Sequence, residues 1–153
     1  MKRGITYEIP NEYGNFISDI LEPLSSLKLF WSVGEQEIYK VEDNKLKNEP
    51  LFLNNVTIGS KTFWKSLKDS KYYVVFSDLK AYSTEKIVPI KTYADSQESN
   101  CQLVLLIADC TIVTVYCKEP QLLENLYKKA TTMDYKNIEY ITDENDERTC
   151  MEN

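Results

Sequence analysis

The sequence predicts an α+β fold, with one mostly antiparallel sheet of five to seven strands and about three helices. Short β-rich runs alternate with turn signals along the chain, which favours antiparallel pairing between neighbours. Two long β-branched runs meet within residues 101–118 and indicate a central hairpin. Three other segments carry apolar residues at a spacing of three to four, which is typical of helices packed on one face of a sheet.

The first third of the chain is predicted to form three strands and one helix. Residues 3–9 alternate apolar and polar side chains, as a half-buried strand does. A helix is expected over residues 12–21, with Asn11 as its N-cap. Residues 28–33 and 37–42 are β-rich and are separated by a short segment that contains glycine. This pattern favours a hairpin.

The segments 43–60 and 83–100 are the hardest to place. Residues 43–50 are polar and are expected to form a loop. Two short apolar runs, at 51–53 and 56–58, indicate an edge strand. A third run at 87–90 indicates another, because it contains a proline, which belongs on sheet edges.

The remaining elements have stronger patterns. A helix is expected over residues 60–69, and a strand from residue 72 that can continue to 82. The apolar residues of this strand do not alternate with polar ones, which predicts that both of its faces are covered. The turn of the 101–118 hairpin is expected to exceed two residues, because cysteine tolerates left-handed backbone poorly. A helix over 120–131 begins with proline, as first turns often do, and a final strand is expected over 137–142.

The acidity of the chain is concentrated near its C-terminus. The 153 residues carry a formal charge of −6, and residues 139–153 contain six acids and one base. We therefore expect a single domain over residues 1–142 and a flexible acidic tail over 143–153. The acidic run within this tail lacks the central glycine of a calcium loop.

The chain contains no histidine, which excludes the common nucleophile–histidine systems and histidine-containing metal sites. The four cysteines do not have the spacing of a zinc motif. A near-neutral body with two arginines argues against nucleic-acid binding. No apolar run is long enough to span a bilayer, and no signal-peptide pattern is present. We therefore expect a cytoplasmic protein that binds neither nucleic acid nor membrane.

Carboxylates are the remaining candidates for catalysis. Asp78, Asp95, Asp109 and Glu119 are expected near strand ends, where a pair of acids can hydrolyse a glycoside. Their spacing does not make them converge, so solvated or capping acids are the favoured interpretation. Cys110 is a possible exposed thiol at a turn, but the neighbouring Asp109 disfavours a reactive thiolate. The sequence predicts no catalytic residue, no cofactor and no metal ligand.

The favoured function is non-enzymatic binding of another protein. An acidic segment on a near-neutral body suits a cationic partner by electrostatic complementarity, and a toxin-neutralising immunity protein is one concrete form. The 11 tyrosines add to this hypothesis, because tyrosine is enriched at protein interfaces. The lysines at 61, 65, 68 and 71 form either a small basic patch or a solvated helix face. The candidate interaction residues are Asp143, Glu144, Asp146 and Glu147.

The alternative is a small-molecule-binding protein or a carboxylate-dependent enzyme. Its site would be a pocket lined by the sheet and by tyrosines. A deep pocket with at least two buried acids would favour this alternative, and a closed core with all acids solvated would count against it.

Two distinctive strings resemble an uncharacterised Bacillus-type bacterial family, known as domain of unknown function 2691. They are Gly-Ile-Thr-Tyr-Glu-Ile-Pro-Asn-Glu-Tyr-Gly over residues 4–14 and the hairpin over 101–118. The resemblance extends from the first residues to the C-terminal part of the chain, with residues 43–100 unmatched. It implies a bacterial cytoplasmic protein with one α+β domain. Neither string is a catalytic signature, so no functional residue is implied.

Overall fold

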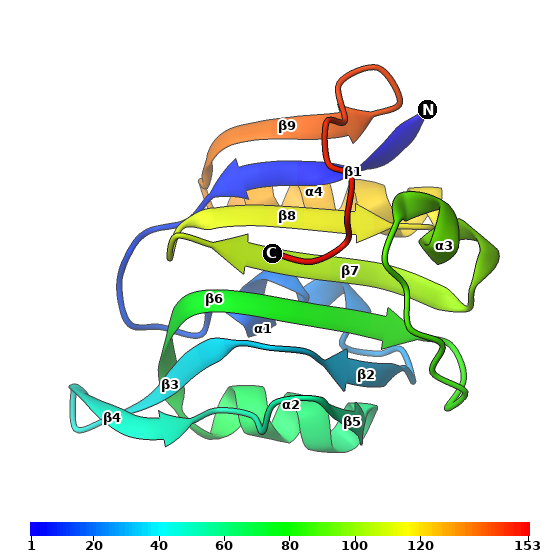
Figure 1. The fold of residues 1–153 in the computed structure, drawn as a ribbon. Coiled ribbons are helices and arrows are strands. Elements are labelled where there is room, and N and C mark those ends of the chain that lie inside the picture. Colours follow the sequence, from blue (N-terminus) through cyan, green and yellow to red (C-terminus); the bar gives the residue numbers. More distant parts are fainter.

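The computed structural model describes residues 1–153 as one nine-stranded sheet with four α-helices (Figure 1). The α+β class is confirmed, and every strand pairing is antiparallel. The predicted five to seven strands and three helices are too few. The strands are β1 (Lys2–Glu8), β2 (Phe30–Val33), β3 (Glu37–Glu42), β4 (Lys45–Pro50), β5 (Val56–Gly59), β6 (Lys71–Tyr82), β7 (Cys101–Ala108), β8 (Ile112–Cys117) and β9 (Lys136–Thr142). The helices are α1 (Phe16–Ile20), α2 (Ser60–Asp69), α3 (Tyr93–Glu98) and α4 (Pro120–Thr132), with a 3-10 helix at Glu22–Leu24.

The sheet is ordered β4-β3-β6-β7-β8-β1-β9, with β2 beside β6 and β5 beside β2. The 12-residue β6 is long enough to pair with β3 along its first half and with β2 along its second half. Strands β2 and β3 therefore share one side of β6. The number of strands exceeds the predicted range because residues 43–60 contain both β4 and β5.

The predicted hairpin between residues 28–33 and 37–42 is wrong, because β2 and β3 both pair with β6 and not with each other. Gly34 has no positive φ, so the segment between these strands lacks the left-handed backbone of a tight hairpin turn. That geometry occurs instead at Asp43–Asn44, whose φ values are 51° and 59°. This turn joins β3 to β4, and the predicted loop over 43–50 therefore contains a strand.

The other local predictions have mixed outcomes. Of the two runs predicted to form an edge strand, residues 56–58 lie in β5, whereas residues 51–53 form no strand. Residues 87–90 also form no strand. Helix α1 begins later than predicted, because Gly14 is held in extended backbone by two hydrogen bonds to Tyr72, of 3.1 and 3.0 Å. The cap is accordingly Asn15 and not Asn11.

The predicted central hairpin is confirmed as β7 and β8. Leu103 lies opposite Cys117, and Ala108 opposite Ile112. Three residues separate Ala108 from Ile112. The turn is therefore longer than two residues, as predicted. Asp109 and Cys110 both have positive φ, at 51° and 66°.

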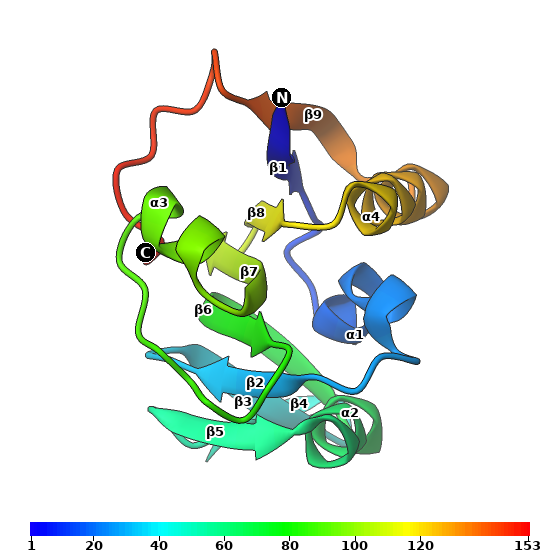
Figure 2. The same cartoon turned by 90° about the vertical axis from the view of Figure 1, so that its right-hand side faces the viewer.

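Helices α1, α2 and α4 cover one face of the sheet, which confirms the predicted one-sided packing for these three (Figure 2). Their apolar stripes meet the strands in a core cluster of 30 buried residues. Trp31 of β2 and Phe63 of α2 stack in this core, with ring centroids 4.0 Å apart. Burial of such large rings is a main source of the folding free energy.

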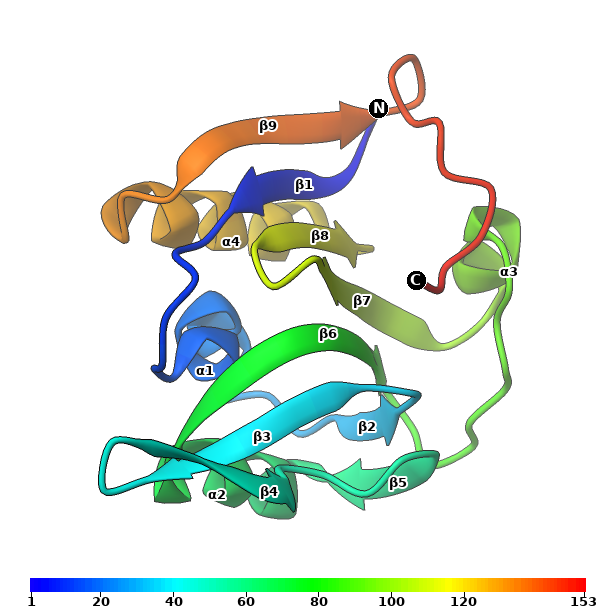
Figure 3. The same cartoon turned by 60° about the vertical axis from the view of Figure 1, so that its left-hand side comes forward.

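The opposite face of the sheet is covered by α3, the preceding loop and the last residues of the chain. Figure 3 shows residues 143–153 leaving the end of β9, passing α3 and ending beside β7. The Met151 side chain is 0% exposed and joins a second apolar cluster that includes Val104, Leu106 and Tyr116. Both faces of the central strands are therefore covered, as the sequence predicts for β6. The longest helix, α4, has 13 residues, which is shorter than a membrane-spanning helix requires.

A β-bulge in β6 decides which side chains face each layer. Glu37 and Ile38 are consecutive, but their partners Phe76 and Val74 are not, so Val75 is an extra residue. An extra residue reverses the alternation of the strand. Beyond the bulge, Leu79 packs among the helices, and the residues on either side of it face the other layer.

Candidate functional site

The sheet face opposite α1, α2 and α4 contains a pocket of about 380 Å³. Its floor is formed by β6 beyond the bulge, and its sides by β2, the loop before α3 and the last two residues of the chain. This volume lies in the range of small-molecule sites.

An ion pair lies at the floor of this pocket. Lys80 Nζ donates a hydrogen bond of 2.6 Å to Asp78 Oδ1. The Asp78 side chain is 14% exposed and that of Lys80 is 10% exposed. Burial raises the pKa of Asp78 above its ordinary value, and this effect outweighs the opposing bond to Lys80. The fold therefore keeps a carboxylate where ionisation is disfavoured, which is typical of functional sites.

Two further carboxylates lie at the rim. Glu152 and Glu35 line the pocket and also raise the pKa of Asp78 by their negative charge. With Lys80 as the one basic residue of the lining, the pocket has a formal charge of −2. It is thus an acidic pocket with a single cation at its base.

Aromatic side chains and main-chain anchors complete the walls. Phe76 and Tyr82 flank the ion pair along β6. The Tyr82 hydroxyl donates to the Val88 carbonyl at 2.9 Å, which holds the loop before α3 over the sheet. The Asn153 side-chain amide donates to the carbonyls of Ser77 and Ile107 at 2.8 and 2.9 Å, and thereby anchors the opposite wall.

The four acids that the sequence indicates as catalytic candidates do not converge. Only Asp78 lines the pocket. Asp95 forms a capping box with Thr92 at the start of α3, and the resulting hydrogen bonds from backbone amides lower its pKa. Asp109 lies in the β7–β8 turn, and Glu119 caps α4 by accepting bonds from two backbone amides.

The acidic residues proposed for interaction divide into two pairs. Asp143 accepts a 2.9 Å bond from Arg3, which lowers its pKa. Asp146 is 3% exposed and accepts bonds from Arg3 at 3.2 Å and from the Tyr116 hydroxyl at 3.0 Å. Glu144 and Glu147 form no salt bridge and are exposed. Two of the four acids therefore attach the segment to the fold, and two remain available to a partner.

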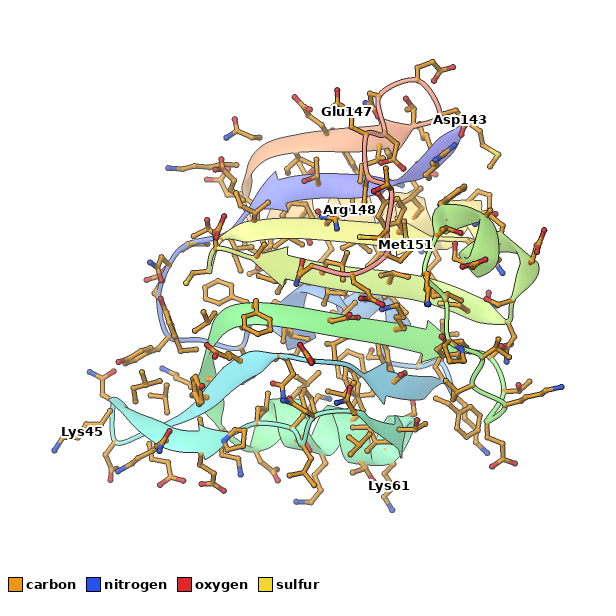
Figure 4. All side chains as sticks on the ribbon, viewed as in Figure 1. Lys45, Lys61, Asp143, Glu147, Arg148 and Met151 are labelled. Atoms are coloured by element: carbon orange, nitrogen blue, oxygen red, sulfur yellow. The ribbon has the colours of Figure 1, made fainter.

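Figure 4 shows how these charges are distributed. Asp143 and Glu147 lie beside the end of β9, whereas Lys45 and Lys61 lie beyond the opposite edge of the sheet. Lys65, in the same helix as Lys61, pairs with Asp69 at 2.7 Å. These acids and these lysines thus lie at opposite edges of the sheet.

Two other features of the sequence have structural roles here. Of the 11 tyrosines, Tyr13 alone is exposed, so the tyrosine content mainly serves internal packing. The Cys110 thiol lies 3.4 Å from the Tyr73 hydroxyl, which also bonds to Asn11. No group of three or more acidic, cysteine or histidine side chains is placed to hold a metal ion.

Sequence reasoning missed Lys80, Glu35 and Glu152 as site residues. The alternation Asp78-Leu79-Lys80-Ala81 indicates a polar strand face and could have revealed Lys80. Glu35 and Glu152 carry no local signal, because only the tertiary fold brings residues so distant in sequence to one pocket.

Comparison with known proteins gives a family but no described activity. A family model with the description "Protein of unknown function (DUF2691)" matches residues 2–152. The uncharacterised protein YncE of Bacillus subtilis (strain 168) is 40% identical over 152 residues, which cover 99% of both chains. No solved structure matches the chain significantly.

Proposed function

We propose that this chain, which belongs to the DUF2691 family of proteins of unknown function, is a binding protein that holds a small molecule in the pocket beside Asp78. The observation that supports this proposal is the buried Asp78–Lys80 pair at the floor of a 380 Å³ pocket. Charged groups are costly to bury, and a ligand that contacts them gives a reason to retain them.

Binding fits the pocket better than catalysis. Asp78, whose side chain is 14% exposed, is the least exposed of the acids that line the pocket, and its hydrogen-bonded partner is a lysine and not a second acid. Carboxylate-based hydrolysis requires two acids at a defined separation. We also propose a cytoplasmic location, which is supported by the four unpaired cysteines.

A ligand screen tests this function. A Cβ atom on Gly34 would lie 3.1 Å from the Asp78 carboxyl group, so Gly34→Leu should fill the pocket. The φ of Gly34 is not positive, and the backbone therefore permits a side chain. In ligand-observed NMR with a metabolite library, we expect hits on the wild type that Gly34→Leu loses. The new Cβ must displace Asp78, so a circular-dichroism spectrum like that of the wild type is the check that Gly34→Leu keeps its fold. Hits that persist in Gly34→Leu, or an absence of hits, would refute the proposal.

Protein binding is a second candidate function. The observation that favours it is the exposed pair Glu144 and Glu147, which follows β9 in the chain and forms no internal salt bridge. A basic protein, such as a cationic toxin, would suit this surface. The test compares proteins captured from native cytosol by the wild type and by Glu144→Gln/Glu147→Gln. A basic protein that the variant no longer retains would support this function, and identical captured sets would exclude it.

A further inference from the structure

We infer that the ligand of the pocket carries an alkylammonium or guanidinium group on a short apolar body. This inference rests on the proposed function and adds the chemical class of the ligand. It follows from the charges of the lining, from the aromatic walls and from the position of Lys80.

The charge of the lining determines which sign of charge the ligand should carry. Three carboxylates and one ammonium line the pocket. Lys80 is already bonded to Asp78 at 2.6 Å, so its positive charge is compensated within the floor. Glu35 and Glu152 form no salt bridge in the structure. An incoming anion would meet two uncompensated carboxylates, whereas a cation would be attracted by both.

The walls select a ligand with an apolar portion. Phe76 and Tyr82 come from the same strand as the ion pair, and Ile87 and Ile90 come from the loop above it. Aromatic faces attract ammonium and guanidinium groups, and aliphatic walls bury methylene groups. A short alkyl chain with a cationic end matches both kinds of surface, and 380 Å³ accommodates a molecule of that size.

Agmatine is a suitable probe, because it combines a guanidinium and an ammonium group on a four-carbon chain. Isothermal titration calorimetry would compare agmatine with succinate and 1,4-butanediol, which are an anion and a neutral molecule that also contain a four-carbon chain. We expect agmatine to bind the wild type and the other two molecules not to bind. Gly-Arg-Gly tests whether a protein side chain supplies the group, and tighter binding of this peptide than of agmatine would overturn the assignment to a free small molecule.

Paired variants locate the charge effect. Glu35→Gln/Glu152→Gln removes the two rim charges with little change in shape. We expect it to weaken agmatine binding about tenfold, since each exposed charge contributes about threefold to the affinity. Glu144→Gln/Glu147→Gln changes the net charge by the same amount outside the pocket and should leave the affinity within about twofold. Equal effects of the two double variants would overturn the inference.

The outcomes also separate this inference from the proposed function. If succinate or butanediol binds, and Gly34→Leu abolishes that binding, the pocket is a ligand site but the cationic class is wrong. If Gly34→Leu leaves the binding of every bound probe unchanged, the site itself is wrong.

Discussion

Replacing either partner of the Asp78–Lys80 pair should have unequal effects on stability at pH 7. Lys80→Met leaves a carboxylate that is 14% exposed without its counter-charge. Loss of one partner of a fully buried pair costs about 3–5 kcal/mol. Because Asp78 keeps some contact with water, we expect the free energy of unfolding to fall by about 2–3 kcal/mol.

Asp78→Asn should cost about 1 kcal/mol or less, because the amide oxygen can still accept the hydrogen bond from Lys80 Nζ and the carboxylates of Glu35 and Glu152 still line the pocket. Burial already disfavours the ionised carboxylate more than Lys80 favours it, so the pKa of Asp78 is raised above 3.8. An acid whose pKa is raised by folding stabilises the protein fully when the pH is below its pKa in the unfolded chain. This stabilisation is lost as the pH rises through the raised pKa of the folded state. The loss of unfolding free energy caused by Lys80→Met should therefore become smaller as the pH is lowered towards about 4, because Asp78 then becomes protonated.

Urea unfolding followed by circular dichroism between pH 4 and pH 7 measures these differences. Lys65→Met is a matched control, because it removes the lysine of an exposed pair with Asp69 and should change stability by about 0.5 kcal/mol or less. Two results would contradict this account of the ion pair. One is that Asp78→Asn lowers the free energy of unfolding as much as Lys80→Met does, and the other is that the effect of Lys80→Met does not depend on pH.

Three further outcomes follow from the fold. Met151→Ala should lower the free energy of unfolding by about 2 kcal/mol, since it empties a buried position in the second cluster; no change in urea unfolding would show that this side chain is not packed in solution. Burial raises the pKa of Cys101 to about 11 and that of Cys117 to about 12. Iodoacetamide at pH 8 should therefore label the exposed Cys150 well before either of them in a mass-spectrometric time course. Equal labelling rates would contradict the burial of Cys101 and Cys117. Cys110→Gly should raise the thermal midpoint, because glycine relieves roughly 1 kcal/mol of backbone strain at a φ of 66°. A lowered midpoint would show that the contact between the Cys110 thiol and Tyr73 stabilises the fold by more than this strain destabilises it.

The parts of the fold that depend on local patterns could be predicted from the sequence. The β7–β8 hairpin has two continuous β-branched runs on either side of a turn, and α4 has both a proline at its start and a clear apolar stripe. In these segments propensity, periodicity and turn chemistry agree.

The remaining parts depend on contacts between distant segments. The partner of both β2 and β3 is β6, and no residue near Gly34 indicates this. The extra residue Val75 in β6 also has no local signature, although it determines that Asp78 faces the pocket. Strand register and the positions of bulges depend on how the whole sheet packs against the layers on its two faces. The sequence of one strand alone does not determine them.

The candidate site shows the same division. Asp78 could be selected as a candidate from its residue type and position, but its environment could not. The acidic composition of residues 143–153 gives no sign that Met151 and Asp146 are buried. Burial of single residues within a polar run is decided by complementary partners, here Arg3 and the second apolar cluster.

The most direct test of the central claim is a map of backbone amide shifts in ¹⁵N-labelled wild-type protein titrated with agmatine. The account predicts that the largest shifts occur at residues 32–36, 76–82 and 152–153, which form or border the pocket. Shifts concentrated at residues 143–147, or an unchanged spectrum, would contradict it.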